Sequence, residues 1–262
     1  MIFITFFILG LIIGSFLNVV VYRLRVAESI AHGRSKCPNC QKQIVWYDNI
    51  PLLSFILLRQ RCRYCREKIS YQYPLVEVGT GLLFALVGLN FFNMADLTTW
   101  TTTLYYLGVI SFLVAIFVYD FLYMEIPDLV LWPAVTWVIA FGLILEGGQG
   151  GQGGIGLIYS GVLAAFVAFA FFFALVAVSK EKWMGMGDAY LVILLGLILG
   201  WPNILLALFL AFGMGAIFGL VLIVLKKKKM QSQIPFAPFL ILGTLLALFW
   251  YAPIVNWYLG LF

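Results

Sequence analysis

Long runs of hydrophobic residues dominate the chain, and short polar or charged segments separate them. We predict helices at 2–22, 74–92, 102–119, 129–145, 155–178, 188–200, 204–225 and 237–258. Seven of these runs have the roughly 17–25 residues that a helix needs to cross a bilayer, whereas 188–200 is shorter. None alternates with the period of two that a transmembrane β-barrel requires. The pattern predicts an all-α polytopic membrane protein with about eight transmembrane helices.

The positive charges support this topology. Eight crossings put the segments 23–73, 120–128, 179–187 and 226–236 on one side, and these segments hold all 16 Lys and Arg residues. Because positive charge accumulates in cytoplasmic loops, that side is predicted to be cytoplasmic and the N-terminus to lie outside. No basic residue precedes the first run, so we expect a retained helix, not a cleaved signal peptide. The expected domains are helix 1 at 1–22, a cytoplasmic domain at 23–73 and a seven-helix membrane domain at 74–262.

Composition agrees with this class of protein and removes one kind of partner. Hydrophobic residues make up 64% of the chain and charged residues 10%, whereas a soluble domain carries about 25% charged residues. The net charge of +5 does not predict nucleic-acid binding, because the positive charges fall in the loops that set topology. The run 226–229, four lysines, is expected to attract anionic lipid at the inner face.

All four cysteines lie in the 23–73 segment. Cys37 and Cys40 form one C-x2-C pair, Cys62 and Cys65 form another, and 21 residues separate the pairs. This spacing is typical of a four-cysteine zinc site, which would also supply folding energy to a small domain. Disulfides are the alternative, but a reducing cytoplasm disfavours them. We expect structural zinc, because four protein ligands leave no open position, and we do not expect His32 to be a ligand.

Two aspartates at helix ends are the candidate catalytic pair. Asp120 ends the apolar run 104–119, and Asp188 follows Gly185 and Gly187 at the start of the short run 188–200. The glycines allow close backbone approach and unusual backbone angles. Asp188 has an alternative interpretation as a helix N-cap. Asp120 has none, because a negative charge is unfavourable at a helix C-terminus, and this indicates function.

Other carboxylates near the inner face have open roles. Asp128 follows Ile126-Pro127, and we favour a capping role for it at the start of the next helix. The sequence leaves open whether Asp128, Glu77 or Glu125 takes part in chemistry. Two carboxylates close together share a proton, so one can activate water while the other protonates a carbonyl, as in aspartyl peptide hydrolysis. The chain has no H-E-x-x-H or G-x-S-x-G motif that would indicate another hydrolytic mechanism.

Five motifs in order, from helix 1 through the sixth helix, resemble the type IV prepilin peptidases. They are 14–23 (GSFLNVVVYR), the C-x2-C pairs flanking 46–54 (WYDNIPLLS), 73–77 (YPLVE), Asp120 with 126–128 (IPD), and 185–188 (GMGD). One departure is Arg25, which stands where the family pattern has proline.

The resemblance implies a GxGD aspartyl protease of the bacterial inner membrane, with Asp120 and Asp188 as the catalytic pair and Gly185, Gly187 and Asp128 in support. Its substrates would be type IV prepilins or pseudopilins, cut after a glycine at the cytoplasmic face. The family also implies N-methylation of the new N-terminus with S-adenosylmethionine. The sequence assigns no residue to that cofactor, which we expect to bind in or beside 23–73.

Two other functions are alternatives to the peptidase. A transporter using the aspartates as ion or proton sites predicts carboxylates near the bilayer midplane in broken helices, whereas these lie at the inner edge. A zinc-loop membrane scaffold explains the cysteines but leaves Asp120 without a role. The sequence does not identify the pilin, the secretion or pilus system, or the oligomeric state.

Overall fold

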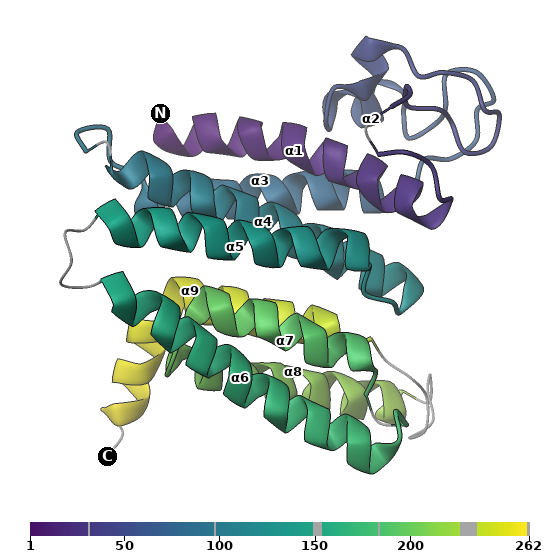
Figure 1. Ribbon diagram of the computed structural model, residues 1–262. Coiled ribbons are helices and arrows are strands. Elements are labelled where there is room, and N and C mark those ends of the chain that lie inside the picture. The colour runs from purple at the N-terminus through teal and green to yellow at the C-terminus, as the bar shows by residue number, and fades with distance from the viewer. Residues whose placement is uncertain (31, 97, 149–153, 183, 226–234, 261–262) are drawn as a thin grey trace. The chain divides into compact units, whose positions relative to one another are not determined.

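The structure is a computed structural model that describes all residues except 31, 97, 149–153, 183, 226–234 and 261–262. The described residues form nine α-helices and one 3-10 turn, and they contain no β-strand beyond two isolated bridges (Figure 1). The predicted all-α class is therefore confirmed. The lysine run 226–229, which is predicted to attract anionic lipid, lies outside the described residues.

Within the described part of the chain, seven helices are long and apolar enough to span a membrane: Ile2–Arg25, Gln72–Phe91, Thr98–Tyr123, Asp128–Leu145, Tyr159–Ser179, Asn203–Val224 and Ala237–Tyr258. The eighth apolar helix, α7 (Met186–Leu199), has 14 residues and a length of about 21 Å. It is short, as the sequence predicted. A crossing by α7, and with it the count of eight crossings, stays a prediction.

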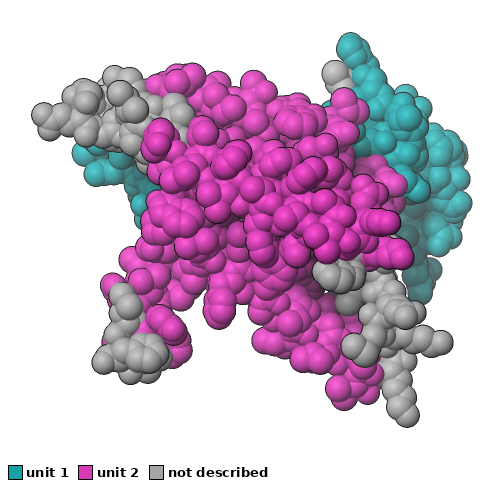
Figure 2. Space-filling model, turned by 60° about the horizontal axis from the view of Figure 1, so that its bottom comes forward, with its two compact units in different colours: residues 1–118 teal, residues 119–262 magenta. Residues whose placement is uncertain are grey.

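The chain forms two compact units, Met1–Val118 and Tyr119–Phe262, drawn in different colours in Figure 2. The first unit contains α1 (Ile2–Arg25), α3 (Gln72–Phe91) and most of α4 (Thr98–Tyr123). Between α1 and α3 lie the 3-10 turn η1 (Trp46–Asn49) and α2 (Leu53–Leu57). The predicted domains at 1–22, 23–73 and 74–262 were defined by the side of the membrane on which each segment lies. Contacts between residues do not test that division, so these domains stay a prediction.

Glycine allows α1 and α3 to pack closely along their lengths. A Cβ added to Gly10 would lie 2.7 Å from the Cα of Gly81, and one on Gly14 would lie 2.8 Å from the Cα of Glu77. These distances are too short for any larger side chain. Small residues four apart commonly bring two membrane helices into close contact in this way. The pair α1–α3 therefore forms a rigid base for the segment between them.

The second unit is arranged around α7. This helix packs against α6 (Gly154–Ser179), α5 (Asp128–Gly148), α9 (Ala237–Leu259) and α8 (Asn203–Val224). Leu191, Val192 and Leu195 on α7 are fully buried. A Cβ on Gly196 would lie 2.5 Å from the Cα of Ala165, so α6 and α7 are also in close backbone contact. The short helix is consequently held on several sides.

Two helices extend beyond their predicted ends. The first runs to Arg25, where the prediction stopped at 22, and α4 covers 98–123 where the prediction was 102–119. The Asp96 carboxylate accepts a hydrogen bond from the Thr98 backbone N–H at 2.9 Å, which stabilises an earlier start of α4. At its C-terminal end, α4 was predicted to stop at 119, just before the charged Asp120. Residues 121–123 are compatible with a helix and continue it to Tyr123.

We predict that Gly14→Ala destabilises the protein, because the new methyl group would overlap the α3 backbone. A loss of about 1–3 kcal/mol is typical of overpacking at such a contact. Gly79→Ala is the matched control: it lies on α3 and no atom lies within 4 Å of its added Cβ. The measurement is the thermal unfolding midpoint of both variants in detergent, and equal midpoints would contradict the close-packing argument.

Candidate functional site

Asp120 lies in the last turn of α4, three residues before the helix ends at Tyr123. The prediction that the helix ends just before Asp120 is therefore wrong by one turn. The side chain still lies where the helix dipole disfavours a negative charge. Asp120 is only 5% exposed, and its Oδ2 atom has no hydrogen-bond partner. A buried carboxylate oxygen without a partner is costly, so this placement is not explained by stability.

Asp188 lies in the first turn of α7 and is not the N-cap, so that alternative interpretation is wrong. The N-cap position belongs to Gly185, whose backbone is extended (φ −78°, ψ 156°). The Asp188 carboxylate accepts a hydrogen bond from the Gly185 backbone N–H. A side chain at the third helical position commonly reaches back to the N-cap in this way. This hydrogen bond orients the Asp188 carboxylate.

The second unit brings Asp120 and Asp188 together, and the two carboxylates interact electrostatically. The segment before α5 is also close to the start of α7, because a Cβ on Gly187 would lie 3.4 Å from the Cβ of Ile126. Asp128 occupies the first turn of α5, where a negative charge is favourable. A capping hydrogen bond from its side chain stays a prediction. Thus three motifs far apart in the sequence meet in one region.

The two glycines near Asp188 differ in their surroundings. Nothing lies within 4 Å of a Cβ added to Gly185, whereas one added to Gly187 would make ordinary contact with Ile126. Neither Gly185 nor Gly187 has a positive φ, because the positive-φ glycines among the described residues are Gly33 and Gly200. The expected close backbone approach is therefore not found at Gly185.

The four cysteines of the first unit form a cluster that can hold a metal ion. The ligand atoms of Cys37, Cys40, Cys62 and Cys65 all lie within 4.8 Å of one another, and the cysteines are free thiols. Cys37 Sγ and Cys65 Sγ are 3.9 Å apart. A tetrahedral ion with Zn–S bonds of about 2.3 Å requires sulfur atoms about 3.8 Å apart, so the cluster fits such an ion. His32 is not in the cluster.

The two cysteine pairs repeat the same local backbone structure. The N–H of Cys37 donates to the carbonyl of Lys42 at 3.0 Å, and the N–H of Cys62 donates to the carbonyl of Glu67 at 2.8 Å. Each turn thereby directs both of its thiols to one point. A hydrogen bond from the Cys65 backbone lowers the pKa of the Cys62 thiol to about 7. For Cys65, a backbone hydrogen bond from Glu67 is outweighed by burial and by the neighbouring thiols, which raise its pKa to about 11. The thiols therefore differ in how readily they form the thiolate, which is the form that binds metals.

Arg23 ties the start of this segment to α1, and sequence reasoning did not single it out. Its side chain is 6% exposed, and its guanidinium donates to four backbone carbonyls. The acceptors and distances are Ser29 at 3.1 Å, Ile30 at 3.0 Å, His32 at 2.9 Å and Gly33 at 2.8 Å. The positive charge within the last turn of the first helix is the signal that could have identified it. Arg23 therefore holds the chain in a tight loop as it leaves the helix.

Asn18 joins α1 to the start of α3, and Glu77 joins α3 to the middle of the segment. The Asn18 amide donates to the carbonyls of Gly14 at 3.3 Å and Tyr73 at 3.2 Å. The Glu77 carboxylate accepts a hydrogen bond from the backbone N–H of Leu52 at 2.8 Å. Both side chains are buried. The sequence does not decide the role of Glu77, and it shows Asn18 only as part of the motif 14–23. Polar residues inside apolar helices were the signal for both.

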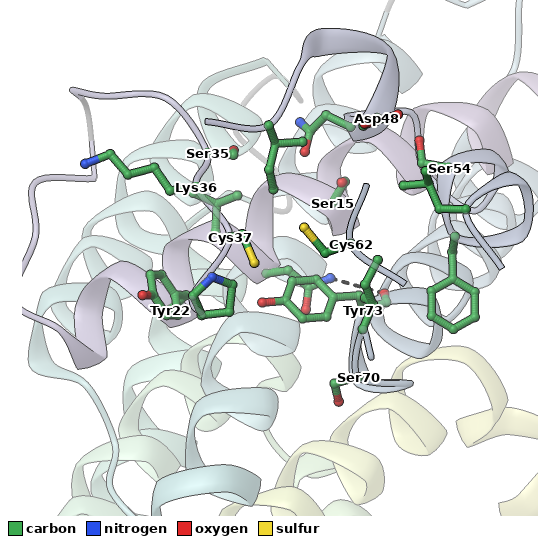
Figure 3. Close-up of a pocket in the computed structure, with 18 of the residues that line it drawn as sticks. Ser15, Tyr22, Ser35, Lys36, Cys37, Asp48, Ser54, Cys62, Ser70 and Tyr73 are labelled. Atoms are coloured by element: carbon green, nitrogen blue, oxygen red, sulfur yellow. Dashed lines mark hydrogen bonds between the residues drawn. The ribbon is translucent and has the colours of Figure 1, made fainter. Parts of the chain in front are cut away.

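These anchors enclose a cavity of about 430 Å³ within the first unit. Its lining comes from the end of α1, the start of α3 and the cysteine segment between them, and includes Ser15, Tyr22, Cys37, Cys62 and Tyr73 (Figure 3). Asn18 and Glu77 also line it. Its volume lies within the range of about 300–1,000 Å³ that small-molecule sites occupy.

Comparison with known proteins identifies related chains along nearly the whole length. Residues 8–91 match the model of the bacterial peptidase A24 N-terminal domain, and residues 107–220 match the model of the type IV leader peptidase family. No solved structure matches the chain.

Curated relatives agree with these family models. The chain is 34% identical to the prepilin leader peptidase/N-methyltransferase of Aeromonas salmonicida (strain A449), covering 97% of this chain and 92% of the relative. It is 30% identical to the protein of the same name from Bacillus subtilis (strain 168), with coverage of 97% and 96%. It is 36% identical to the type 4 prepilin-like proteins leader peptide-processing enzyme of Escherichia coli O78:H11, with coverage of 89% and 88%. The chain therefore belongs to the type IV leader peptidase family.

Proposed function

We propose that this membrane protein cleaves the leader peptides of type IV prepilins or pseudopilins and then N-methylates the new N-terminal residue. Membership of the family and the names of its relatives support both activities. The single observation that carries the peptidase is the meeting of Asp120 and Asp188 in one unit. Cleavage takes place after a glycine, where the basic leader meets the apolar pilin helix.

The two aspartates act as a general base and a general acid. One carboxylate is ionised and takes a proton from a water molecule, whose oxygen attacks the scissile carbonyl carbon. The other carboxyl is protonated and donates its proton to the carbonyl oxygen. The tetrahedral intermediate collapses when the C–N bond breaks and the leaving amine takes a proton. The unpartnered Oδ2 of Asp120 is available for this exchange, and the hydrogen bond from Gly185 orients Asp188.

The placement of both aspartates at helix ends favours this function over the two alternatives. Asp120 is in the last turn of α4 and Asp188 in the first turn of α7, so neither lies in the middle of a long membrane helix, where a transporter would hold its ion. A scaffold held by the cysteine cluster leaves the buried, unpartnered Asp120 without a role. The distribution of Lys and Arg supports an inner-membrane protein with its N-terminus outside and its active site at the cytoplasmic face.

We expect Asp120→Asn and Asp188→Asn each to slow leader cleavage at least ~100-fold, because an amide neither accepts nor donates the proton that hydrolysis moves. The measurement is the mass of a prepilin incubated with purified protein in detergent. Asp96→Asn is the control, since Asp96 is an exposed carboxylate in the loop before α4. Cleavage at the wild-type rate by either variant would refute the aspartyl mechanism.

We propose further that the cysteine cluster holds structural zinc. The sulfur separations match a tetrahedral zinc site, and four thiolates leave no position for a substrate. Few side chains in the segment are buried: η1 has none and α2 has only Ser54. A metal would supply the folding energy that this small apolar core does not.

Elemental analysis of purified protein is expected to find about one zinc per chain, with Cys62→Ser well below that value because three thiolates bind the ion more weakly. His32→Ala should keep its zinc, because the cluster does not include this residue. Limited proteolysis should cut the cysteine segment faster after chelation. Full zinc in the Cys62→Ser variant, or none in wild type, would contradict the assignment.

A further inference from the structure

The cavity of the first unit carries a buried acceptor that no described residue satisfies. Asn18 is 2% exposed, and its amide nitrogen makes the two hydrogen bonds described above. Its Oδ1 atom has no partner. This side chain lines the cavity between the two helices and the cysteine segment. An unpartnered buried acceptor in a cavity of this size calls for a ligand that donates a hydrogen bond.

Glu77 adds a buried carboxyl group to the same cavity. It is 6% exposed, and its carboxylate interacts with the backbone N–H of Leu52 and with Ser15, neither of which is cationic. The nearby buried cation, Arg23, gives its guanidinium to four backbone carbonyls. A buried carboxylate of this kind favours a ligand with a positive charge.

The remaining lining suits a ligand that also has an aromatic ring and a carboxylate. Tyr22, Tyr73 and Phe55 supply aromatic surface, on which a purine can stack. Arg34 and Lys36 supply positive charge to the same cavity. The ligand class is therefore a cation of drug-like size with hydrogen-bond donors, a flat ring and an acidic group. S-adenosylmethionine has all of these features: a sulfonium, an ammonium, ribose hydroxyls, adenine and a carboxylate.

We propose that this cavity is the S-adenosylmethionine site, with Asn18 and Glu77 as binding residues. The proposal rests on the proposed N-methyltransferase function and gives it a location. When bound, the cofactor would supply the methyl group for the N-terminal amine of the processed pilin, and Asn18 and Glu77 would hold it in the cavity.

Binding of small molecules to the full chain in detergent tests this assignment by isothermal titration calorimetry. The probes are S-adenosylmethionine and methylthioadenosine, which lacks the sulfonium, the ammonium and the carboxylate. Glu77→Gln keeps an acceptor for Leu52 but removes the charge. It should weaken S-adenosylmethionine binding by roughly tenfold to a hundredfold and affect methylthioadenosine much less, because only the first ligand is charged. Asp96→Asn, which removes an exposed carboxylate, should bind both ligands like wild type.

Zinc content and thermal unfolding reveal whether Glu77→Gln folds. If it does not fold, a second variant and a second measurement test the proposal. Asn18→Leu should weaken binding of both ligands, while Asn90→Leu, an exposed α3 position whose amide bonds its own helix, should not. Ultraviolet cross-linking of labelled S-adenosylmethionine to wild type should label peptides from 14–23 and 72–77.

The outcomes separate failure of the site from failure of the function. If wild type neither binds S-adenosylmethionine nor methylates a pre-cut pilin, the proposed methyltransferase function fails, and this inference fails with it. If wild type binds and methylates while Glu77→Gln and Asn18→Leu bind equally well, or the label maps elsewhere, only the location is wrong. In that case the cavity holds water, which satisfies Asn18 Oδ1.

Discussion

The structure depends on one constraint: an apolar chain in a membrane must pair each polar group that it buries. Most described side chains obey it locally. Thr80 and Thr244 donate to carbonyls one turn earlier in their own helices, and Arg23 spreads its charge over four carbonyls. Among the described residues, the buried side-chain atoms without a partner are Asn18 Oδ1 and Asp120 Oδ2. Each belongs to one of the two candidate sites.

Close helix packing makes these exceptions persistent. In the first unit, Gly10 and Gly14 bring α1 against α3, so Asn18 and Glu77 are carried by a rigid pair of helices. In the second unit, Gly196 brings α7 against α6, and α7 carries Asp188 at its start. Functional groups on rigid elements keep a defined geometry at lower cost than groups on loops. The glycines far from the chemistry therefore have a clear role in positioning.

The cysteine segment illustrates how a small domain with little apolar core is ordered. Its two cysteine turns bring four thiols to one point, and the anchors at Arg23, Asn18 and Glu77 join it to the helix pair. The cavity is a product of that attachment, because its walls come from the segment and its helices together. Each candidate site lies within one compact unit, so variants at the two sites test separate activities.

The sequence by itself determined the helical class, the helix positions within a few residues, the cysteine cluster and the importance of the motifs around Asp120 and Asp188. These features are local: an apolar run long enough to span a bilayer, or a C-x2-C spacing, has the same meaning wherever the chain places it. Only the tertiary structure decided that Gly185, not Asp188, caps α7, and that α4 continues past Asp120. It alone brought Asn18 and Glu77 to one cavity, because contacts such as that between Asn18 and Tyr73, 55 positions apart, depend on how two helices pack, which no local pattern encodes.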